Sequence, residues 1–171
     1  SISEFFEKLG APLNNRMWSW GGVDHENRRV FVRAWEDQIT RSKQSALRLI
    51  RLAHHSHYAA NPTNLGYAER TRHLDLLRKG YSGFVVLCRV KDPAARPRSI
   101  AGYNSDRVLE LDGLQVVDGD EFGVIVGREI VRFLDDATVT PDLIRGPASS
   151  SAAPEEKRDP GSGAGVTIEE R

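Results

Sequence analysis

The chain has 171 residues, with 24 Lys and Arg side chains and 24 Asp and Glu side chains. This length suits one domain with its own hydrophobic core and is short for two. The balanced charge excludes a protein whose overall positive field attracts a polyanion, so binding to nucleic acid would need local clusters of basic residues.

The composition also predicts the compartment. The one cysteine, Cys88, excludes an internal disulfide, and the apolar residues around it predict a buried, unreactive thiol. No stretch approaches the ~20 apolar residues of a membrane span, and the N-terminal residues lack the basic and apolar regions of a signal peptide. We therefore expect a soluble, cytoplasmic protein that makes no contact with a membrane.

A short helix and a tryptophan-rich hairpin are predicted first along the chain. Residues 3–10 suit a helix that is capped by Ser3 and ended by Gly10. Over residues 16–39, two runs of alternating residues flank the polar turn 24–29, which is typical of a β-hairpin. This hairpin holds all three tryptophans of the chain and is the first candidate for a functional site.

The alternation predicts which side chains share a face. Neighbouring residues of a strand point to opposite faces, so Trp18 and Trp20 are expected on one face and Ser19 on the other. With Trp35 from the second run, the rings could wall a pocket that stacks a planar group, and Asp37 and Arg33 would add polar contacts. The alternative is that the tryptophans are core residues, as large aromatic side chains usually are.

Three elements are predicted in the middle of the chain. Residues 46–52 suit a helix or a strand, and a strand is favoured because the histidine-rich loop 54–58 cuts the apolar run short. The strongest helix covers residues 65–79, with Asn64 or Thr63 as a cap and Gly80 at its end.

The next part of the chain is predicted as short strands. Two Asp-Gly pairs, 112–113 and 118–119, supply hairpin turns between them. Seven or eight strands with one main helix and a short N-terminal helix indicate an α+β fold built on a small mixed β-barrel, closed or nearly closed. The later strands are expected at 83–90, 99–103, 108–111, 114–117, 122–126 and 130–134.

The composition changes after residue 136. Residues 137–171 are rich in Pro, Gly, Ser and Ala and hold almost no large apolar side chains. Such a segment cannot bury a core, so we expect a disordered, low-complexity tail. The predicted organisation is one domain, 1–136, followed by this tail, to which no function is assigned.

The histidines and the polar side of the main helix offer a second kind of site. His55 and His57 would share one side of an extended loop, but no carboxylate or cysteine motif completes a metal site, so no metal or other cofactor is expected. Glu69 and His73 could act as an acid and a base, although a solvated helix face is the expected role. The enzymatic alternative is a small hydrolase or nuclease that uses the 54–57 loop together with Asp37.

Four segments together resemble a known bacterial domain. They are WSWGG, VFVRAWED, NLGYAERTRHLDLLRKG and FVVLCRVKDP, and they span about residues 10–134. The pattern is similar to a domain that occurs alone or fused to HNH endonucleases, whose layout resembles the PUA-like barrels (EVE, YTH, ASCH and SRA modules). The resemblance implies recognition of a modified base that is flipped into an aromatic pocket. It implies no cleavage by this chain, which lacks a nuclease portion, and suggests a partner nuclease in a restriction system.

We therefore predict a module that binds nucleic acid, DNA rather than RNA, and recognises a modified base without catalysis. A protein-interaction domain with tryptophans in its core is the third hypothesis. By analogy with the family, the base pocket is expected at Trp18, Ser19, Trp20, Trp35, Asp37, Tyr103 and Asn104. Basic clusters near the histidine-rich loop would contact the phosphate backbone, and we assign to them Arg33, Arg41, Lys43, Arg48, Arg51, His55, His57, Arg70 and Arg72.

Overall fold

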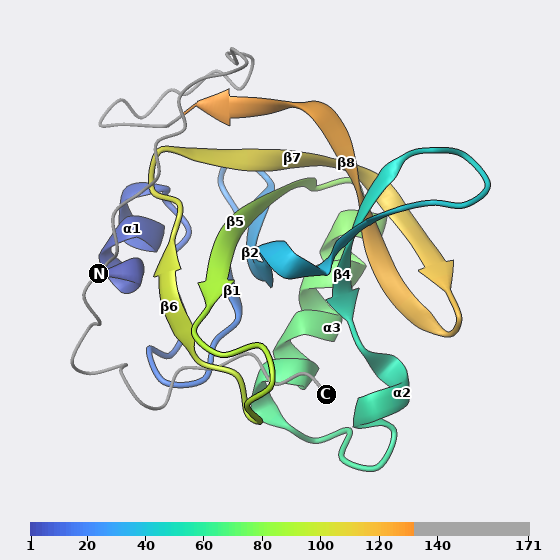
Figure 1. Ribbon diagram of the computed structural model, residues 1–171. Coiled ribbons are helices and arrows are strands. Elements are labelled where there is room, and N and C mark those ends of the chain that lie inside the picture. Colours follow the sequence, from blue (N-terminus) through green and yellow to red (C-terminus); the bar gives the residue numbers. More distant parts are fainter. Residues whose placement is uncertain (132–171) are drawn as a thin grey trace.

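A computed structural model describes residues 1–131 of the chain. The fold is mixed α+β, as expected, and is built on one sheet of eight strands (Figure 1). The predicted tail and the end of the strand predicted at 130–134 lie outside the described residues. The helical elements are α1 (Ile2–Lys8), the short 3₁₀ turn η1 (Glu36–Gln38), α2 (His55–Tyr58) and α3 (Leu65–Arg78).

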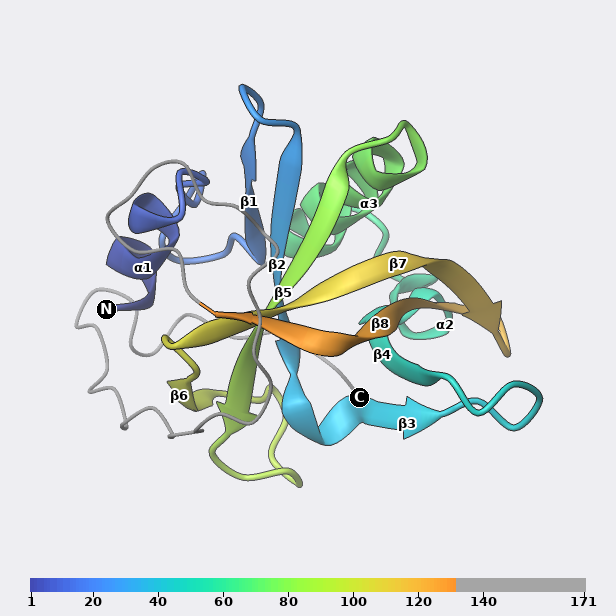
Figure 2. The same ribbon diagram turned by 90° about the horizontal axis from the view of Figure 1, so that it is seen from above.

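The eight strands form an open sheet. Their order is β1-β2-β5-β7-β8-β4-β3, with β6 paired to β5, so within residues 1–131 the edge strands β1 and β3 do not pair with each other. The predicted barrel is therefore not confirmed, and Figure 2 shows the strands from above. The strands are β1 (Gly21–Asp24), β2 (Arg29–Trp35), β3 (Ile39–Arg41), β4 (Arg48–Ala53), β5 (Ser82–Val90), β6 (Ile100–Tyr103), β7 (Arg107–Val117) and β8 (Asp120–Val131).

The two Asp-Gly pairs behave differently. The pair at 112–113 lies inside β7, where the pairing with β8 shifts between Leu111 and Leu114, so the hairpin turn predicted there is wrong. Gly113 has a φ of +98°, which lets the strand bulge without ending. The pair at 118–119 forms the predicted turn, with positive φ at both residues. One long pair, β7 and β8, therefore replaces the separate short strands that the sequence predicted.

The tryptophan-rich hairpin forms, but its first strand starts later than predicted. β1 begins at Gly21, and residues 16–18 form a turn. Asn15 Oδ1 accepts hydrogen bonds from two backbone N–H groups of this turn, so these groups need no partner in the sheet. Trp18 and Trp20 precede β1, and the expectation that they alternate along one strand is wrong.

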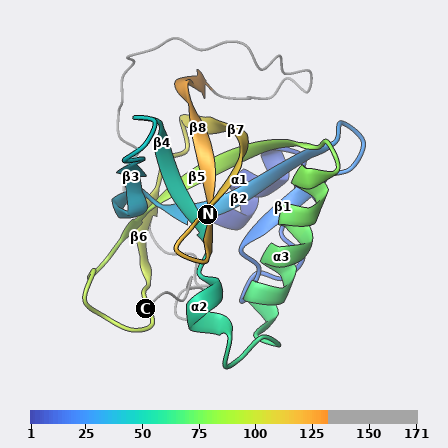
Figure 3. The same cartoon turned by 90° about the vertical axis from the view of Figure 1, so that its right-hand side faces the viewer.

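The core has two layers, one on each face of β2. Phe31 and Trp35 belong to an aromatic cluster that Phe6 of α1 joins. Val32 points to the opposite face, into an aliphatic cluster that Leu74 of α3 joins. Figure 3 shows α3 running alongside β1 and β2. The period of two in β2 therefore supplies both layers, because alternate residues of a strand face opposite sides.

The helix ends follow their caps. α1 is held by a capping box around Ser1, two residues before the predicted cap at Ser3. Gly10 follows α1 with a φ of +81°, as predicted for the residue that ends the helix. Asn64 caps α3 as predicted, and part of the predicted 54–58 loop is the short helix α2.

Gly66 lies where α3 packs most closely on the rest of the chain. A Cβ at this position would lie 2.2 Å from the Trp20 ring. Alanine usually stabilises a helix relative to glycine by about 1 kcal/mol, but here the buried ring occupies the place of the methyl group. We expect Gly66→Ala to lower the free energy of unfolding by about 1–3 kcal/mol, as overpacking does, in urea denaturation. A gain in stability would contradict this packing.

Candidate functional site

Three side chains form a row across the sheet, which we call the aromatic row. Trp35 on β2 pairs directly with Cys88 on β5, and Cys88 pairs with Tyr103 on β6. Paired residues point to the same face, and adjacent strands lie ~4.8 Å apart, so the Trp35 and Tyr103 backbones are about 10 Å apart with a small residue between them. All three are buried, with exposed fractions of 1%, 0% and 9% in that order along the row.

Cys88 is the inert thiol that the sequence predicted. It is free of any disulfide and fully buried. Burial raises the pKa of Cys88 to about 12, so the thiol stays protonated at neutral pH. Because a thiolate is the reactive form of cysteine, this residue offers no nucleophile to the row.

Arg33 lies within the core next to the row and has an exposed fraction of 0%. Its Nη2 donates to the backbone carbonyl of Ser19 at 2.6 Å, whereas Nε and Nη1 have no hydrogen-bond partner in the described part of the chain. Burial lowers the pKa of the guanidinium, and the nearby Glu69 carboxylate acts in the opposite direction.

A second arginine, Arg98, joins two of the predicted pocket residues. It donates to both carboxylate oxygens of Asp37, at 2.9 and 2.7 Å, and its guanidinium carbon lies 5.3 Å from the centroid of the Trp35 ring. Nε of Arg98 and Nε1 of Trp35 are buried without a hydrogen-bond partner among residues 1–131. Sequence reasoning missed Arg98, because nothing near it in the chain signals that it is buried.

Trp20 and Ser19 are packed into the core. The Trp20 ring lies 5.8 Å from the ring of Tyr58 and 5.6 Å from the guanidinium carbon of Arg70. Ser19 Oγ donates to Glu69 at 3.0 Å, and both groups are buried. These contacts hold the segment before β1 against α3, and they favour the core role for Trp20.

The other predicted pocket residues lie at the ends of strands. Trp18 is half-buried in the turn before β1. Tyr103 contacts Phe5 of α1, with ring centroids 5.6 Å apart. Asn104 is half-buried, and its side-chain oxygen accepts from the backbone N–H of Asp106 and Arg107, which shapes the turn into β7.

The inner side of α3 carries charged residues that the sequence assigned to solvent. Glu69 and His73 have exposed fractions of 3% and 7%, so the expected solvated face is wrong. Burial raises the pKa of Glu69, while hydrogen bonds from Trp20 N and Ser19 Oγ oppose the rise. Glu69 is tolerated inside because these two groups from a distant part of the chain donate to its carboxylate.

The histidines of the predicted loop bind the beginning of β8. His55 Nε2 lies 2.9 Å from Glu121 Oε1, and His55 Nδ1 lies 2.6 Å from the hydroxyl of Tyr67. His54 Nδ1 lies 2.9 Å from a carboxylate oxygen of Asp120. The enzymatic alternative joined these histidines with Asp37, but no described contact does so, and Arg98 holds that carboxylate instead.

The residues predicted to contact phosphate fall into two groups. Arg33 and Arg70 are buried and donate to backbone carbonyls, so the folded chain does not present them to a phosphate backbone. The others reach the surface at least in part: Arg41, Lys43 and Arg72 are exposed, and Arg48, Arg51, His55 and His57 are half-buried.

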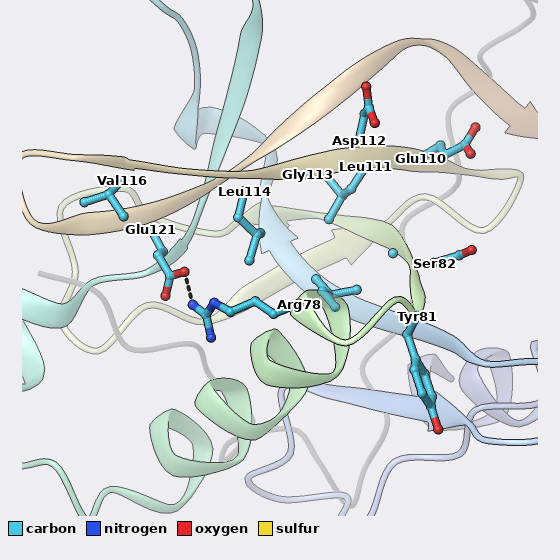
Figure 4. A pocket seen from close by; sticks show the side chains of 12 residues that line it. Arg78, Tyr81, Ser82, Glu110, Leu111, Asp112, Gly113, Leu114, Val116 and Glu121 are labelled. Atoms are coloured by element: carbon cyan, nitrogen blue, oxygen red, sulfur yellow. Dashed lines mark hydrogen bonds and ion pairs between the residues drawn. The ribbon is translucent and has the colours of Figure 1, made fainter.

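A pocket with a volume of about 520 Å³ lies away from the aromatic row (Figure 4). It lies between the end of α3 and the β7–β8 pair, and Leu111 and Leu114 line it. The ion pair between Arg78 and Glu121 lies at one end, as the dashed line marks. None of the predicted base-pocket residues lines this space.

No protein-family model, no curated protein and no solved structure matches this chain. Within residues 1–131, no group of three or more His, Cys, Asp or Glu side chains is arranged to hold a metal ion. No helix in the same range is long and apolar enough to cross a membrane.

Proposed function

We propose that this chain binds DNA and takes a modified base, flipped out of the duplex, onto the aromatic row without catalysing a reaction. The observation that carries this proposal is a set of buried donors without partners around Trp35. The WSWGG and VFVRAWED segments resemble a domain that occurs alone or fused to HNH endonucleases, and the similarity of its layout to the base-binding PUA-like barrels points the same way. The donors are Nε and Nη1 of Arg33, Nε1 of Trp35 and Nε of Arg98.

These donors favour a ligand that brings acceptors. A buried donor without a partner costs ~1–3 kcal/mol, and native interiors leave few of them. The edges of bases offer carbonyl oxygens and ring nitrogens as acceptors. A base also stacks on aromatic side chains, with ~1–3 kcal/mol for each stacked base. Trp35 and Tyr103 would supply the aromatic faces.

A base would have to displace a neighbour to reach the row. Phe5 of α1 is half-buried and contacts Tyr103, so it is the first side chain that we expect to move. α1 has seven residues, and a helix this short depends on docking for its stability. Stacking and hydrogen bonds would have to offset this opening and the few kcal/mol of base extrusion.

The test is a titration of the full chain with matched duplexes that carry cytosine, 5-methylcytosine or 5-hydroxymethylcytosine, at two salt concentrations. We expect preference for a modified duplex that persists at the higher salt, because base contacts release fewer counterions than phosphate contacts. Trp35→Phe keeps an aromatic ring but removes the unpaired N–H and part of the stacking surface, so it should reduce the preference by about fivefold or more, where fivefold is the value of one hydrogen bond. Lys43→Ala, at an exposed site, should weaken binding to all duplexes equally.

Two results would contradict this proposal. Weak binding that ignores the modification and disappears at the higher salt would leave only backbone electrostatics for these marks. A preference that Trp35→Phe does not change would mean that the base is read away from the aromatic row.

A hydrolase is the second candidate, and one contact chain favours it. Tyr67, His55 and Glu121 align a hydroxyl, an imidazole and a carboxylate, in the order that activates nucleophiles. Burial raises the pKa of Tyr67, and Glu121 and Asp120 act in the same direction, which opposes a phenolate nucleophile. A nuclease assay with the same chain and duplexes separates the candidates, because the base-binding module should leave every duplex intact.

A further inference from the structure

A second, smaller pocket of about 260 Å³ lies between α3 and β1. β1 contributes Gly21 and Gly22, and α3 contributes Glu69, Arg72 and His73. A Cβ on residue 21 would lie 3.3 Å from Nδ1 of His73, so a larger side chain there would press on the imidazole. No residue of the aromatic row lines this pocket, which makes it a separate site.

His73 is the unusual member of this pocket. Its exposed fraction is 7%, and its Nδ1 is buried with no hydrogen-bond partner in the described part of the chain. Buried polar groups are normally paired, and an unpaired one costs ~1–3 kcal/mol. The imidazole therefore has a hydrogen-bonding capacity that the protein itself does not use.

Arg72 is the one arginine in the lining of this pocket. Burial lowers the pKa of the His73 imidazole to about 3, and Arg70, Arg72 and His25 act in the same direction. Glu69 is the one carboxylate in the lining, and its two oxygens already accept hydrogen bonds from the segment before β1. The Arg72 guanidinium and the His73 imidazole are therefore the groups in the lining that can donate to a bound anion.

We propose that this pocket binds a small oxyanion of the phosphate class, held by the Arg72 guanidinium and the His73 imidazole. The guanidinium supplies charge and a planar pair of donors that matches phosphate. The neutral imidazole supplies one N–H donor for a further hydrogen bond. A free phosphate compound and the phosphate of a nucleic-acid backbone offer the same chemistry, and the experiment has one arm for each.

The first arm titrates the full chain with inorganic phosphate and follows the His73 ring by NMR, with chloride at equal ionic strength as the reference anion. We expect saturable changes in the ring signals and a rise in the pKa of His73, because a bound anion favours the imidazolium form. Arg72→Ala should weaken phosphate binding about tenfold or more, since a hydrogen bond to a charged group contributes ~1.5–3 kcal/mol. Lys79→Ala removes the same charge next to the same helix and should leave binding unchanged.

Two results overturn the phosphate site. One is an equal response of His73 to phosphate and chloride, and the other is an Arg72→Ala variant that binds phosphate as well as Lys79→Ala does.

The second arm adds unmodified duplex to the phosphate-bound chain. Displacement of phosphate from His73 assigns the site to the nucleic-acid backbone, and retention assigns it to a free phosphate compound. The phosphate site and the base proposal can fail separately. Trp35→Phe tests the base proposal and should not change the His73 signals, so failure of the phosphate site leaves the base proposal intact.

Discussion

Arg70→Met is expected to lower the free energy of unfolding by about 3–5 kcal/mol, the cost of breaking a buried charged network. Arg70 has an exposed fraction of 2% and donates to three backbone carbonyls. Nη1 bonds Leu52 O at 2.5 Å, and Nη2 bonds Trp20 O at 3.1 Å and Arg33 O at 2.7 Å. These carbonyls lie in β4, in β2 and before β1, so one guanidinium joins α3 to three segments of the chain.

The size of this effect follows from the groups that are left behind. Methionine fills a similar volume but donates no hydrogen bond, so Leu52 O, Trp20 O and Arg33 O all lose the bond from Arg70. Trp20 O keeps the backbone N–H of Arg33 as a partner, and each carbonyl left without one costs ~1–3 kcal/mol before relaxation. Urea denaturation at neutral pH measures the loss, with Lys79→Met as the control. Lys79 is exposed at the end of the same helix, so its change should stay within about 0.5 kcal/mol. If the two variants unfold alike, Arg70 does not join these segments.

His73 is expected to make the fold sensitive to acid. The pKa of its imidazole falls from 6.5 to about 3 on folding, chiefly through burial. The unfolded chain therefore binds this proton first as the pH falls, and the free energy of unfolding declines from pH 6.5 towards about pH 3. Across the whole window the contribution is on the order of 4 kcal/mol, and it is fully present above pH 6.5.

His73→Gln tests this dependence, because glutamine is polar and does not titrate. The free energy of unfolding of both proteins is measured between neutral pH and about pH 4, and the difference between them should shrink or reverse as the pH falls. Burial raises the pKa of Glu69 above its ordinary value of 4.5, so this carboxyl favours the folded state as the pH falls, which is opposite to the effect of His73. Glu69 is present in both proteins, so its contribution largely cancels in the difference between them. Parallel curves for the two proteins would show that His73 is not a buried neutral imidazole.

Local patterns predicted most of the helices and strands correctly. The strand predictions at 46–52 and 83–90 correspond to β4 and β5, and the helix prediction at 65–79 corresponds to α3. Apolar periodicity and a side-chain cap act over a few residues, so a sequence displays them directly. The Asp-Gly pair at 112–113 carries the same local signal as the pair at 118–119. Residues 112–113 form a bulge and no turn, because β7 pairs with β8 on both sides of them.

The candidate site was predicted only in part. Trp35, Asp37 and Tyr103 were named from the sequence, but their arrangement in space depends on the register of β2, β5 and β6 and on the contacts of Arg98. Arg98 lies 61 positions from Asp37 in the chain, too far for any local pattern to join them. The unpaired donors of Arg33 were not foreseen either, because a charged residue in an alternating run is normally assigned to the solvent side.

The sequence alone determined the α+β class, the capped main helix and the place of the tryptophan-rich hairpin, since each depends on residues that are close in the chain. Tertiary packing decided that the sheet stays open, that Trp20 and Trp35 are buried and that the charged side of α3 faces inward. The physical reason is the cost of burying polar groups. A guanidinium or carboxylate can be buried only where backbone groups or side chains from distant parts of the chain form hydrogen bonds with it. Only the folded chain brings these groups together.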